Sequence, residues 1–416
     1  MAYSEVKNLY RRKILQTLIA STGFAATGLG AQTRGQGRLV VVFLRGAYDG
    51  LSALVPHGDP DYYRLRPSVA IPAPDGTSQT TLALDKHFGL HPALAPLMPM
   101  WRQGVLAAVP CAGSPDPTRS HFDAQHYWEV GVPGKSGGDT GWLNALAGSS
   151  FAGGAIGVGE ANPFILSGID KVQLIPRGLA ATRQGALGDS RTRDAVMKLY
   201  AGQDSLSQTF RTGADSRMQT AQALSADMAP AGISGGEAQA ANNGAGPAQG
   251  LVLDAQHLGT LMRKDPQLRF GFLSAGGWDT HANQGAATGA LAQSLGSLAN
   301  TLVQLRRDFS QSGDVIVVAS EFGRTSAENG TRGTDHGHGN AMWLLGDLVQ
   351  GGRWHGRWEG LAAGNLHDAR DLPVHHDFRA VLAQLLRRNL GMKLADLDRL
   401  FPGFQWDASL DALMRS

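Results

Sequence analysis

Carboxylates and imidazoles are the side chains that most often bind metal ions. The second half of this sequence gathers five of them in three short clusters: Asp279 with His281, Glu321, and His336 with His338. Apolar runs over residues 268–273 and 315–318 precede the first two clusters, and such runs are typical of buried strands in a parallel sheet. Ligands bind at the carboxyl ends of such strands, so these clusters indicate an enzyme-like site.

The spacing within two of the clusters also favours metal binding. Asp279 and His281 are two residues apart, so in an extended segment both side chains leave the same face and can hold one ion. His336 and His338 repeat that spacing, and Gly337 allows a close approach of the backbone. The alternative is that these are ordinary polar loop residues. The occurrence of three clusters together favours a metal or anion site.

The first half of the chain adds further candidates at predicted strand ends. Residues 39–44 form an apolar strand that leads to Asp49, which is either part of the site or the N-cap of a helix. A strand over residues 105–110 leads to Arg119 and Ser120, where a helix begins. Ser120 either caps that helix or serves as a nucleophile in its positive N-terminal field, and Arg119 could clamp an anion.

The bulk properties favour one large domain of an α/β class, with helices packed on a sheet. The chain has 416 residues, and leucines recur at helical spacing over residues 290–309. A net charge of +2, without a basic stripe, makes nucleic acid an unsuitable partner. Cys111 is the single cysteine, so neither an internal disulfide nor a cysteine zinc cage can form.

The N-terminus is predicted to be an export signal over residues 1–31. Arg11, Arg12 and Lys13 precede a moderately apolar stretch, a pattern that resembles the signal of the twin-arginine export machinery. A membrane anchor is the alternative, but the apolar part is interrupted and shorter than the ~20 residues that a span requires. We therefore expect a periplasmic protein with no stable membrane span. Residues 229–249, rich in Ala, Gly and Gln, are predicted to be a flexible insertion.

In combination, five motifs resemble one family of exported bacterial proteins, known as domain of unknown function 1501 (DUF1501). They are FLRGAYDG (residues 43–50), RSHFDAQ (119–125), GGWDTH (276–281), SEFGRT (320–325) and DHGHG (335–339). The resemblance covers most of the chain and implies a domain over about residues 38–404. That family is similar in fold to the alkaline phosphatase and sulfatase superfamily, which implies a central, mostly parallel sheet with helices on both faces.

The resemblance also implies two metal ions near a nucleophile. Asp49 and Ser120 would face one ion, while Asp279, His281 and one of His336 or His338 would hold the other. Glu321 stands where the superfamily has an aspartate followed by histidine, and Phe322 replaces that histidine. Zinc suits the histidines, whereas magnesium, manganese or calcium suits the carboxylates. A sulfatase is disfavoured, because Pro115 occupies the place of the residue that sulfatases convert to formylglycine.

These observations favour a metal-dependent hydrolase of phosphate or related esters, with Ser120 as nucleophile and Arg119 and Arg324 as anion clamps. Its substrate would be a small molecule or a component of the cell envelope. The rival hypothesis is a metal-stabilised binding or assembly protein that keeps the same fold without turnover. Phe322 favours the rival, because it leaves one ion a ligand short.

Overall fold

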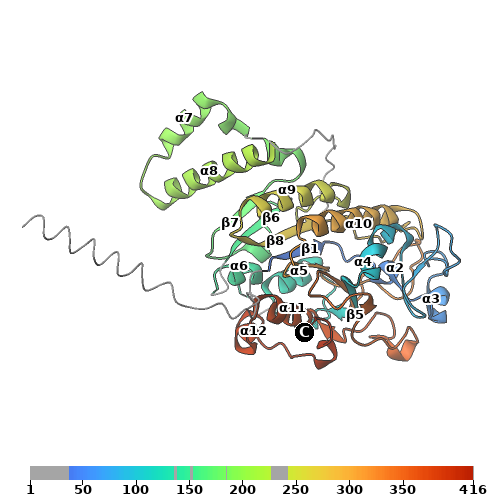
Figure 1. The fold of residues 1–416 in the computed structure, drawn as a ribbon. Helices are drawn as coiled ribbons and strands as arrows, with labels where there is room; N and C mark the ends of the chain where they lie inside the picture. The colour runs from blue at the N-terminus through green and yellow to red at the C-terminus, as the bar shows by residue number, and fades with distance from the viewer. Residues whose placement is uncertain (1–36, 135–137, 150–152, 184, 226–241, 416) are drawn as a thin grey trace, which may run out of the picture. The chain divides into compact units, whose positions relative to one another are not determined.

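The computed structural model describes residues 37–134, 138–149, 153–183, 185–225 and 242–415 (Figure 1). Contacts divide the chain into a unit over residues 1–34 and a unit over residues 35–416. The predicted export signal, residues 1–31, lies outside the described residues. In the described part of the chain, no helix has both the length and the apolar character that crossing a bilayer would require.

A nine-stranded sheet forms the centre of the second unit. Its order is β11-β5-β10-β9-β1-β8-β6-β7, and β12 also pairs with β5. The strands are β1 (Leu39–Leu44), β5 (Leu106–Gly113), β6 (Gly154–Val158), β7 (Val172–Ile175), β8 (Leu268–Ala275), β9 (Val315–Ala319), β10 (Asn340–Leu345), β11 (Arg353–Trp354) and β12 (His376–Asp377). Within this sheet β10 alone runs against the others, so the predicted, mostly parallel sheet is confirmed.

Helices cover both faces of the sheet, as predicted (Figure 1). The α-helices of the described residues are α2 (Gly50–Ala53), α3 (Pro60–Leu65), α4 (Met98–Arg102), α5 (His121–Val130), α6 (Trp142–Ala147), α7 (Ser190–Leu199), α8 (Ser205–Ser225), α9 (Leu251–Lys264), α10 (Ala290–Asp308), α11 (Phe378–Leu390) and α12 (Leu394–Leu400). One apolar cluster joins α9 and α10 to one face, and another joins α5, α6, α11 and α12 to the opposite face. A separate three-stranded sheet is made by β2 (Leu54–Val55), β3 (Leu82–Ala83) and β4 (Gly89–Leu90).

Strand β1 shows why a continuous apolar run predicts this architecture. Val40, Val42 and Leu44 belong to the core on the α9 and α10 side, while Leu39, Val41 and Phe43 belong to the core on the other side. Successive side chains of a strand point to opposite faces, so a strand covered on both faces must be apolar throughout. All six residues have no exposed surface.

The segment before β5 is not one continuous α-helix. It is a 3-10 helix over Pro92–Leu97 followed by the short helix α4. Prolines at positions 92, 96 and 99 lack the backbone N–H that a continuous α-helix needs. The expected insertion over residues 229–249 lies outside the described residues up to residue 241. Its last part is packed, since Asn242 is buried and accepts a hydrogen bond from the Gly277 backbone at 3.0 Å.

Candidate metal centre

The sheet topology brings loops from distant parts of the sequence to one edge. Strands β1, β8 and β9 are parallel neighbours in register, with Leu44 opposite Ala275 and Phe43 opposite Ala319. The loops that follow them therefore start side by side. Because β10 is antiparallel, its first residue, Asn340, lies at this same edge. The segment just before β10, which contains His336, is thus placed beside the loop that contains Asp279.

A glycine allows the first two of these loops to touch. Gly46 has a φ of +110°, a backbone conformation that disfavours a side chain. A Cβ atom at this position would lie 2.9 Å from the backbone nitrogen of Asp279. The close contact between the loops after β1 and β8 therefore depends on glycine at position 46.

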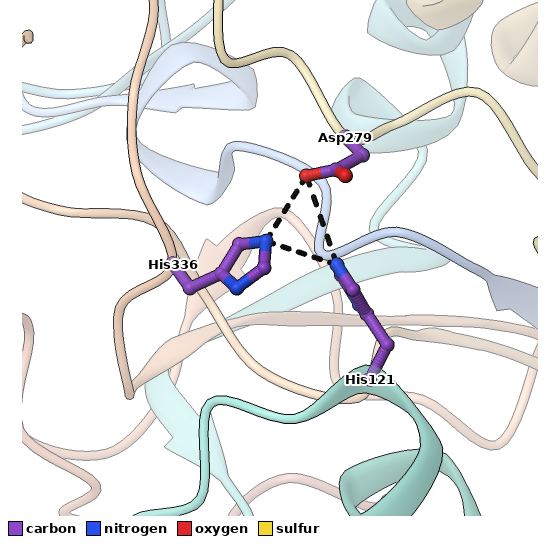
Figure 2. A group of neighbouring side chains, drawn as sticks. All are labelled: His121, Asp279 and His336. Atoms are coloured by element: carbon purple, nitrogen blue, oxygen red, sulfur yellow. Dashed lines mark hydrogen bonds and ion pairs between the residues drawn. The ribbon is translucent and has the colours of Figure 1, made fainter. Parts of the chain in front are cut away.

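Four side chains converge at this edge, and we call them the donor cluster: His121, Asp279, His281 and His336. The Nε2 atom of His336 lies 3.0 Å from Nε2 of His121 and 3.0 Å from Nε2 of His281. Asp279 Oδ1 lies 3.1 Å from His336 Nε2, 2.9 Å from His281 Nε2 and 3.7 Å from His121 Nε2. Figure 2 shows three of these side chains pointing toward one another from separate segments. They are His121, Asp279 and His336, whose donor atoms all lie within 4.8 Å of one another.

The other ring nitrogen of each histidine is occupied by an acceptor. Nδ1 of His121 lies 2.8 Å from Glu321, Nδ1 of His281 lies 3.0 Å from Asp335, and Nδ1 of His336 lies 3.0 Å from the Arg119 carbonyl oxygen. Carboxylates and carbonyls only accept, so each Nδ1 carries the proton and each Nε2 of a neutral ring presents a lone pair. Three lone pairs and a carboxylate brought this close repel one another unless a proton or a metal cation lies among them. The donor cluster therefore fits a metal ion.

The electrostatics of the donor cluster favour positive charge as well. Burial raises the pKa of Asp279, but hydrogen bonds to His121 and His336 and the charge of Arg324 outweigh it, so this pKa lies below the usual range. Burial lowers the pKa of His121, but hydrogen bonds to Asp279 and Glu321 raise it to about 9. Asp279 is therefore ionised at neutral pH, and the site attracts either protons or a metal cation.

Glu321 lies beside the donor cluster and contacts His121, and its predicted role as a metal ligand stays a prediction. Its carboxylate has no exposed surface, and Oε1 accepts the hydrogen bond from His121 Nδ1. Burial raises the pKa of Glu321, but the hydrogen bond and charge of His121 and the hydrogen bond from Gln125 outweigh burial. The pKa therefore lies below the usual range, and Glu321 is ionised. In this position the carboxylate orients the His121 ring and makes its Nε2 atom a better metal ligand.

A Glu321→Gln substitution tests this role. We expect the dissociation constant of the bound ion to rise about 10- to 100-fold, the usual effect of losing a carboxylate that supports a metal-bound histidine. Isothermal titration of the metal-stripped protein would measure it. Glu328→Gln is a matched control, because Glu328 accepts from Ser68 and Val69, away from the donor cluster. An equal loss in both variants would contradict the specific role of Glu321.

Phe322 occupies the position where the family resemblance implies a histidine ligand. Its buried ring stacks on the His121 ring with a centroid distance of 4.9 Å and an interplanar angle of 27°. The ring also lies 5.2 Å from that of His336. Phe322 thus forms an apolar wall of the donor cluster and supplies no donor atom.

Asp49 and Arg324, both predicted site residues, are engaged in buried contacts. Both oxygens of Asp49 are bound by Arg66, at 2.6 and 3.1 Å, and Oδ2 also accepts from Ser52 and Gln284. The Arg324 side chain has no exposed surface and donates to four backbone carbonyls and, at 2.5 Å, to Asp279 Oδ1. Arg324 thereby ties the loop after β1 to Asp279. Its predicted role as an anion clamp and the predicted role of Asp49 as a metal ligand stay predictions.

The remaining predicted residues lie around the donor cluster. Ser120 is the N-cap of α5, where its hydroxyl accepts from the backbone of Asp123 at 3.4 Å. Arg119 is partly exposed, and its guanidinium pairs with Asp371 at 2.7 Å. His338 is buried against the ring of His367, with centroids 4.6 Å apart. The structure therefore separates His338 from His336, although the two are only two residues apart in sequence.

His121 is the donor that the sequence interpretation missed. It is the first residue of α5 and directly follows Ser120, which drew attention as either a cap or a nucleophile. The signal that could have found it is its place in the RSHFDAQ motif, at the helix N-terminus after a predicted strand. Histidine at such a position projects from the carboxyl edge of the sheet, where the other donors also lie.

Comparison with known families gives one match that spans most of the chain. A family model described as "Protein of unknown function (DUF1501)" matches residues 36–400. No curated protein matches the sequence.

Solved structures similar to this one include an alkaline phosphatase, a lipoteichoic acid synthase and a sulfatase. The alkaline phosphatase of the Antarctic bacterium TAB5, in a mutant with Mg bound in its M3 site, is 10% identical, with a TM-score of 0.35 and coverage of 77% of this chain and 94% of that chain. The lipoteichoic acid synthase LtaP from Listeria monocytogenes is 10% identical, with a TM-score of 0.32 and coverage of 89% and 76%. The PsFucS1 sulfatase from Pseudoalteromonas sp. is 12% identical, with a TM-score of 0.38 and coverage of 92% and 74%. Similarity at this level says nothing about chemistry, which has to be inferred from the side chains.

Proposed function

Because this chain belongs to the DUF1501 family, whose description names no activity, we propose a function from its own side chains: a metal-dependent hydrolase of phosphate or related esters. The observation that carries the proposal is the convergence of three Nε2 atoms and Asp279 Oδ1, each histidine being held by an acceptor on Nδ1. Such second contacts are typical of functional metal sites and fix the ring orientation before the ion arrives.

The donor cluster is accessible from one side. The side chain of His281 is 42% exposed and that of His336 is 24% exposed, while the Glu321 and Phe322 side is closed. An ester that approaches from the His281 side would reach the cluster without any change in the core. A catalytic site must keep a coordination position for water or substrate, and the exposed His281 side is where we propose that an ester reaches the ion.

His121, His281, His336 and Asp279 would hold the ion. Imidazole nitrogens with one carboxylate oxygen suit zinc best, whereas magnesium, manganese and calcium prefer oxygen donors. A bound ion of this kind supplies Lewis acidity, which polarises an ester and stabilises charge on the departing oxygen. Arg324 keeps Asp279 in place and ionised, while Glu321 holds the proton on Nδ1 of His121.

Ser120 is the proposed nucleophile. It directly precedes the donor residue His121, it is only partly buried, and it lies at the positive end of α5. Among the described residues, its hydroxyl oxygen accepts the long contact from the Asp123 backbone. This contact does not use the hydroxyl proton, so capping leaves that proton free to be removed. Arg119, which is next to it, is proposed to attract the anionic ester.

A Ser120→Gly substitution separates capping from catalysis. Glycine at an N-cap lowers stability by only a few tenths of a kcal/mol. We expect hydrolysis of p-nitrophenyl phosphate or bis(p-nitrophenyl) phosphate to fall by about 1000-fold or more, because the nucleophile is gone. Metal content should stay at the wild-type level. A variant with full metal content and undiminished hydrolysis would exclude Ser120 as the nucleophile.

A second function is supported by two specific observations. Phe322 adds no donor, and Asp49 is paired with Arg66, so the residues implied for a second ion are engaged elsewhere. A protein that keeps one ion as a structural element, and binds or assembles other components without turnover, is consistent with both. Metal content without hydrolysis of any phosphomonoester, phosphodiester or sulfate ester would favour this second function.

We also propose that the protein is exported to the periplasm by the twin-arginine machinery, on the basis of Arg11 and Arg12. Replacing both arginines with lysine keeps the charge but removes the pair. We expect the variant chain to stay in the cytoplasmic fraction, at its full precursor size. Arg34→Lys, beyond the predicted signal, is the control and should be exported normally. Equal export of both variants would contradict the proposal.

A further inference from the structure

A series of buried hydrogen bonds leads from the donor cluster into the core of the protein. Its first member is the Glu321 carboxylate, whose Oε1 accepts from three donors: His121 Nδ1 at 2.8 Å, the backbone N–H of Gly46 at 2.8 Å and Gln125 Nε2 at 2.9 Å. Oε2 accepts from the Ser320 hydroxyl at 2.8 Å. The position of this carboxylate, and hence of the His121 ring, is determined by these partners.

The side chain of Gln125 is itself fixed in one orientation. Its Oε1 accepts from Arg45 Nη1 at 2.8 Å, and Gln125 is only 3% exposed. A guanidinium can only donate and an ionised carboxylate can only accept. The amide oxygen must therefore face Arg45 and the NH₂ group must face Glu321. A reversed amide would lose both hydrogen bonds in a buried environment.

Arg45 is equally well fixed. It has no exposed surface, and its guanidinium contacts Glu129 at 2.8 Å and Glu160 at 2.9 Å. Glu129 in turn accepts from the backbone of Ile165 at 2.7 Å. The orientation of the Gln125 amide is thus set by Arg45, which directly follows β1, and through it by Glu129 on α5 and Glu160 after β6.

We infer that Gln125, held by Arg45, is a positioning residue for the metal site, and that it acts on His121 through Glu321. This inference rests on the proposed metal-dependent function. Gln125 lies on the same helix as His121, one turn further along. Its NH₂ group donates to Glu321 Oε1, the same atom that accepts from Nδ1 of His121, and so holds Oε1 in place. The contact strengthens Nε2 of His121 as a donor without touching the ion.

Metal binding to a Gln125→Met variant tests the inference, since methionine keeps the length and volume but cannot donate to Glu321. Co²⁺ serves as the probe, because its visible absorption reports the ligand arrangement as well as the affinity. We expect the dissociation constant for Co²⁺ to rise about tenfold, the lower end of the range for residues that support a metal-bound histidine. The absorption band should change shape. Gln384→Met is the matched control, because Gln384 is also a buried glutamine on a helix, α11. Its amide donates to Asp407 and Asp411, which lie after that helix.

A double-mutant cycle with Glu321→Gln shows whether Gln125 acts through Glu321. If it does, the double variant binds Co²⁺ as weakly as Glu321→Gln alone, within about twofold. Two results would overturn the inference and leave the proposed function intact. In one, the losses of Co²⁺ affinity in the two single variants multiply in the double variant. In the other, the Gln125→Met protein binds Co²⁺ like the wild type and the Gln384→Met control. A folded wild-type protein that binds no Co²⁺ or other divalent ion would overturn both.

Discussion

Replacing His336 with alanine is expected to remove the bound ion from the purified protein. The Nε2 atom of His336 is central in the donor cluster, since it lies within 3.1 Å of His121, His281 and Asp279 donor atoms. Loss of a supporting residue already weakens metal binding 10- to 100-fold, so loss of this donor should weaken it by more than about 100-fold. Elemental analysis and metal titration would measure the effect, and hydrolysis should fall with it.

His338→Ala is the matched control for this experiment. It lies in the same loop, two residues further along, but its ring packs against His367 and not in the donor cluster. We expect His338→Ala to retain the ion at wild-type stoichiometry. The sequence leaves undecided which of the two histidines binds the ion. If the His338→Ala protein loses the ion and the His336→Ala protein keeps it, His338 is the ligand.

Replacing Asp49 with asparagine is expected to destabilise the protein and to leave its metal content unchanged. Asp49 and Arg66 form an ion pair at 2.6 Å, with side chains that are 1% and 0% exposed. Removing one partner leaves the Arg66 charge buried and uncompensated, which lowers the free energy of unfolding by about 3–5 kcal/mol. Denaturant unfolding of the folded, metal-stripped protein would measure the change.

Asp61→Asn provides the comparison, because Asp61 pairs with Arg64 on the surface at 2.9 Å. Exposed pairs contribute only about 0–1 kcal/mol. An Asp49→Asn protein with wild-type stability that has lost its ion would contradict the structural role and support the metal-ligand role. Equal stability of the Asp49→Asn and Asp61→Asn proteins would also contradict it.

The same ion pair gives a dependence on pH. Burial raises the pKa of Asp49, but the charge and hydrogen bonds of Arg66 outweigh it and hold this pKa below the usual range. Above about pH 4 Asp49 is ionised in both folded and unfolded chains, so its full contribution to stability is present. As the pH falls below about 4, the unfolded chain takes up the proton first and the contribution is lost. Asp49→Asn should remove this part of the acid sensitivity.

Strand identity could be predicted from the sequence because the strands are covered on both faces. The run over residues 39–44 matches β1 residue for residue, and the run over residues 315–318 misses only Ala319 of β9. By contrast, β6 and β7 went unpredicted, because the Gly154–Val158 strand contains two glycines and the Val172–Ile175 strand has only four residues. The antiparallel direction of β10 was not predicted either, since an apolar run is compatible with both parallel and antiparallel pairing.

The site was predicted in part, for reasons that follow from the same physics. Asp279 and His281 were placed together correctly by their spacing after a strand, and their side chains lie 2.9 Å apart. The same spacing argument did not bring His336 and His338 together, because the ring of His336 packs against His281 while that of His338 packs against His367. Glu321 and Asp49 could not be assigned from residue type, since a carboxylate that binds an ion and one that binds His121 or Arg66 look alike in sequence.

The separation of the donors along the chain has one more consequence. His121 and His336 are 215 residues apart, and Asp279 and His336 are 57 residues apart. An ion held by all three would close two long loops and restrict the unfolded chain in the same way as a cross-link. Cys111 is the single cysteine in the sequence, so the chain cannot form an internal disulfide of its own. In a protein proposed to work in the periplasm, where disulfides commonly provide such cross-links, the ion at the edge of the sheet would take their place.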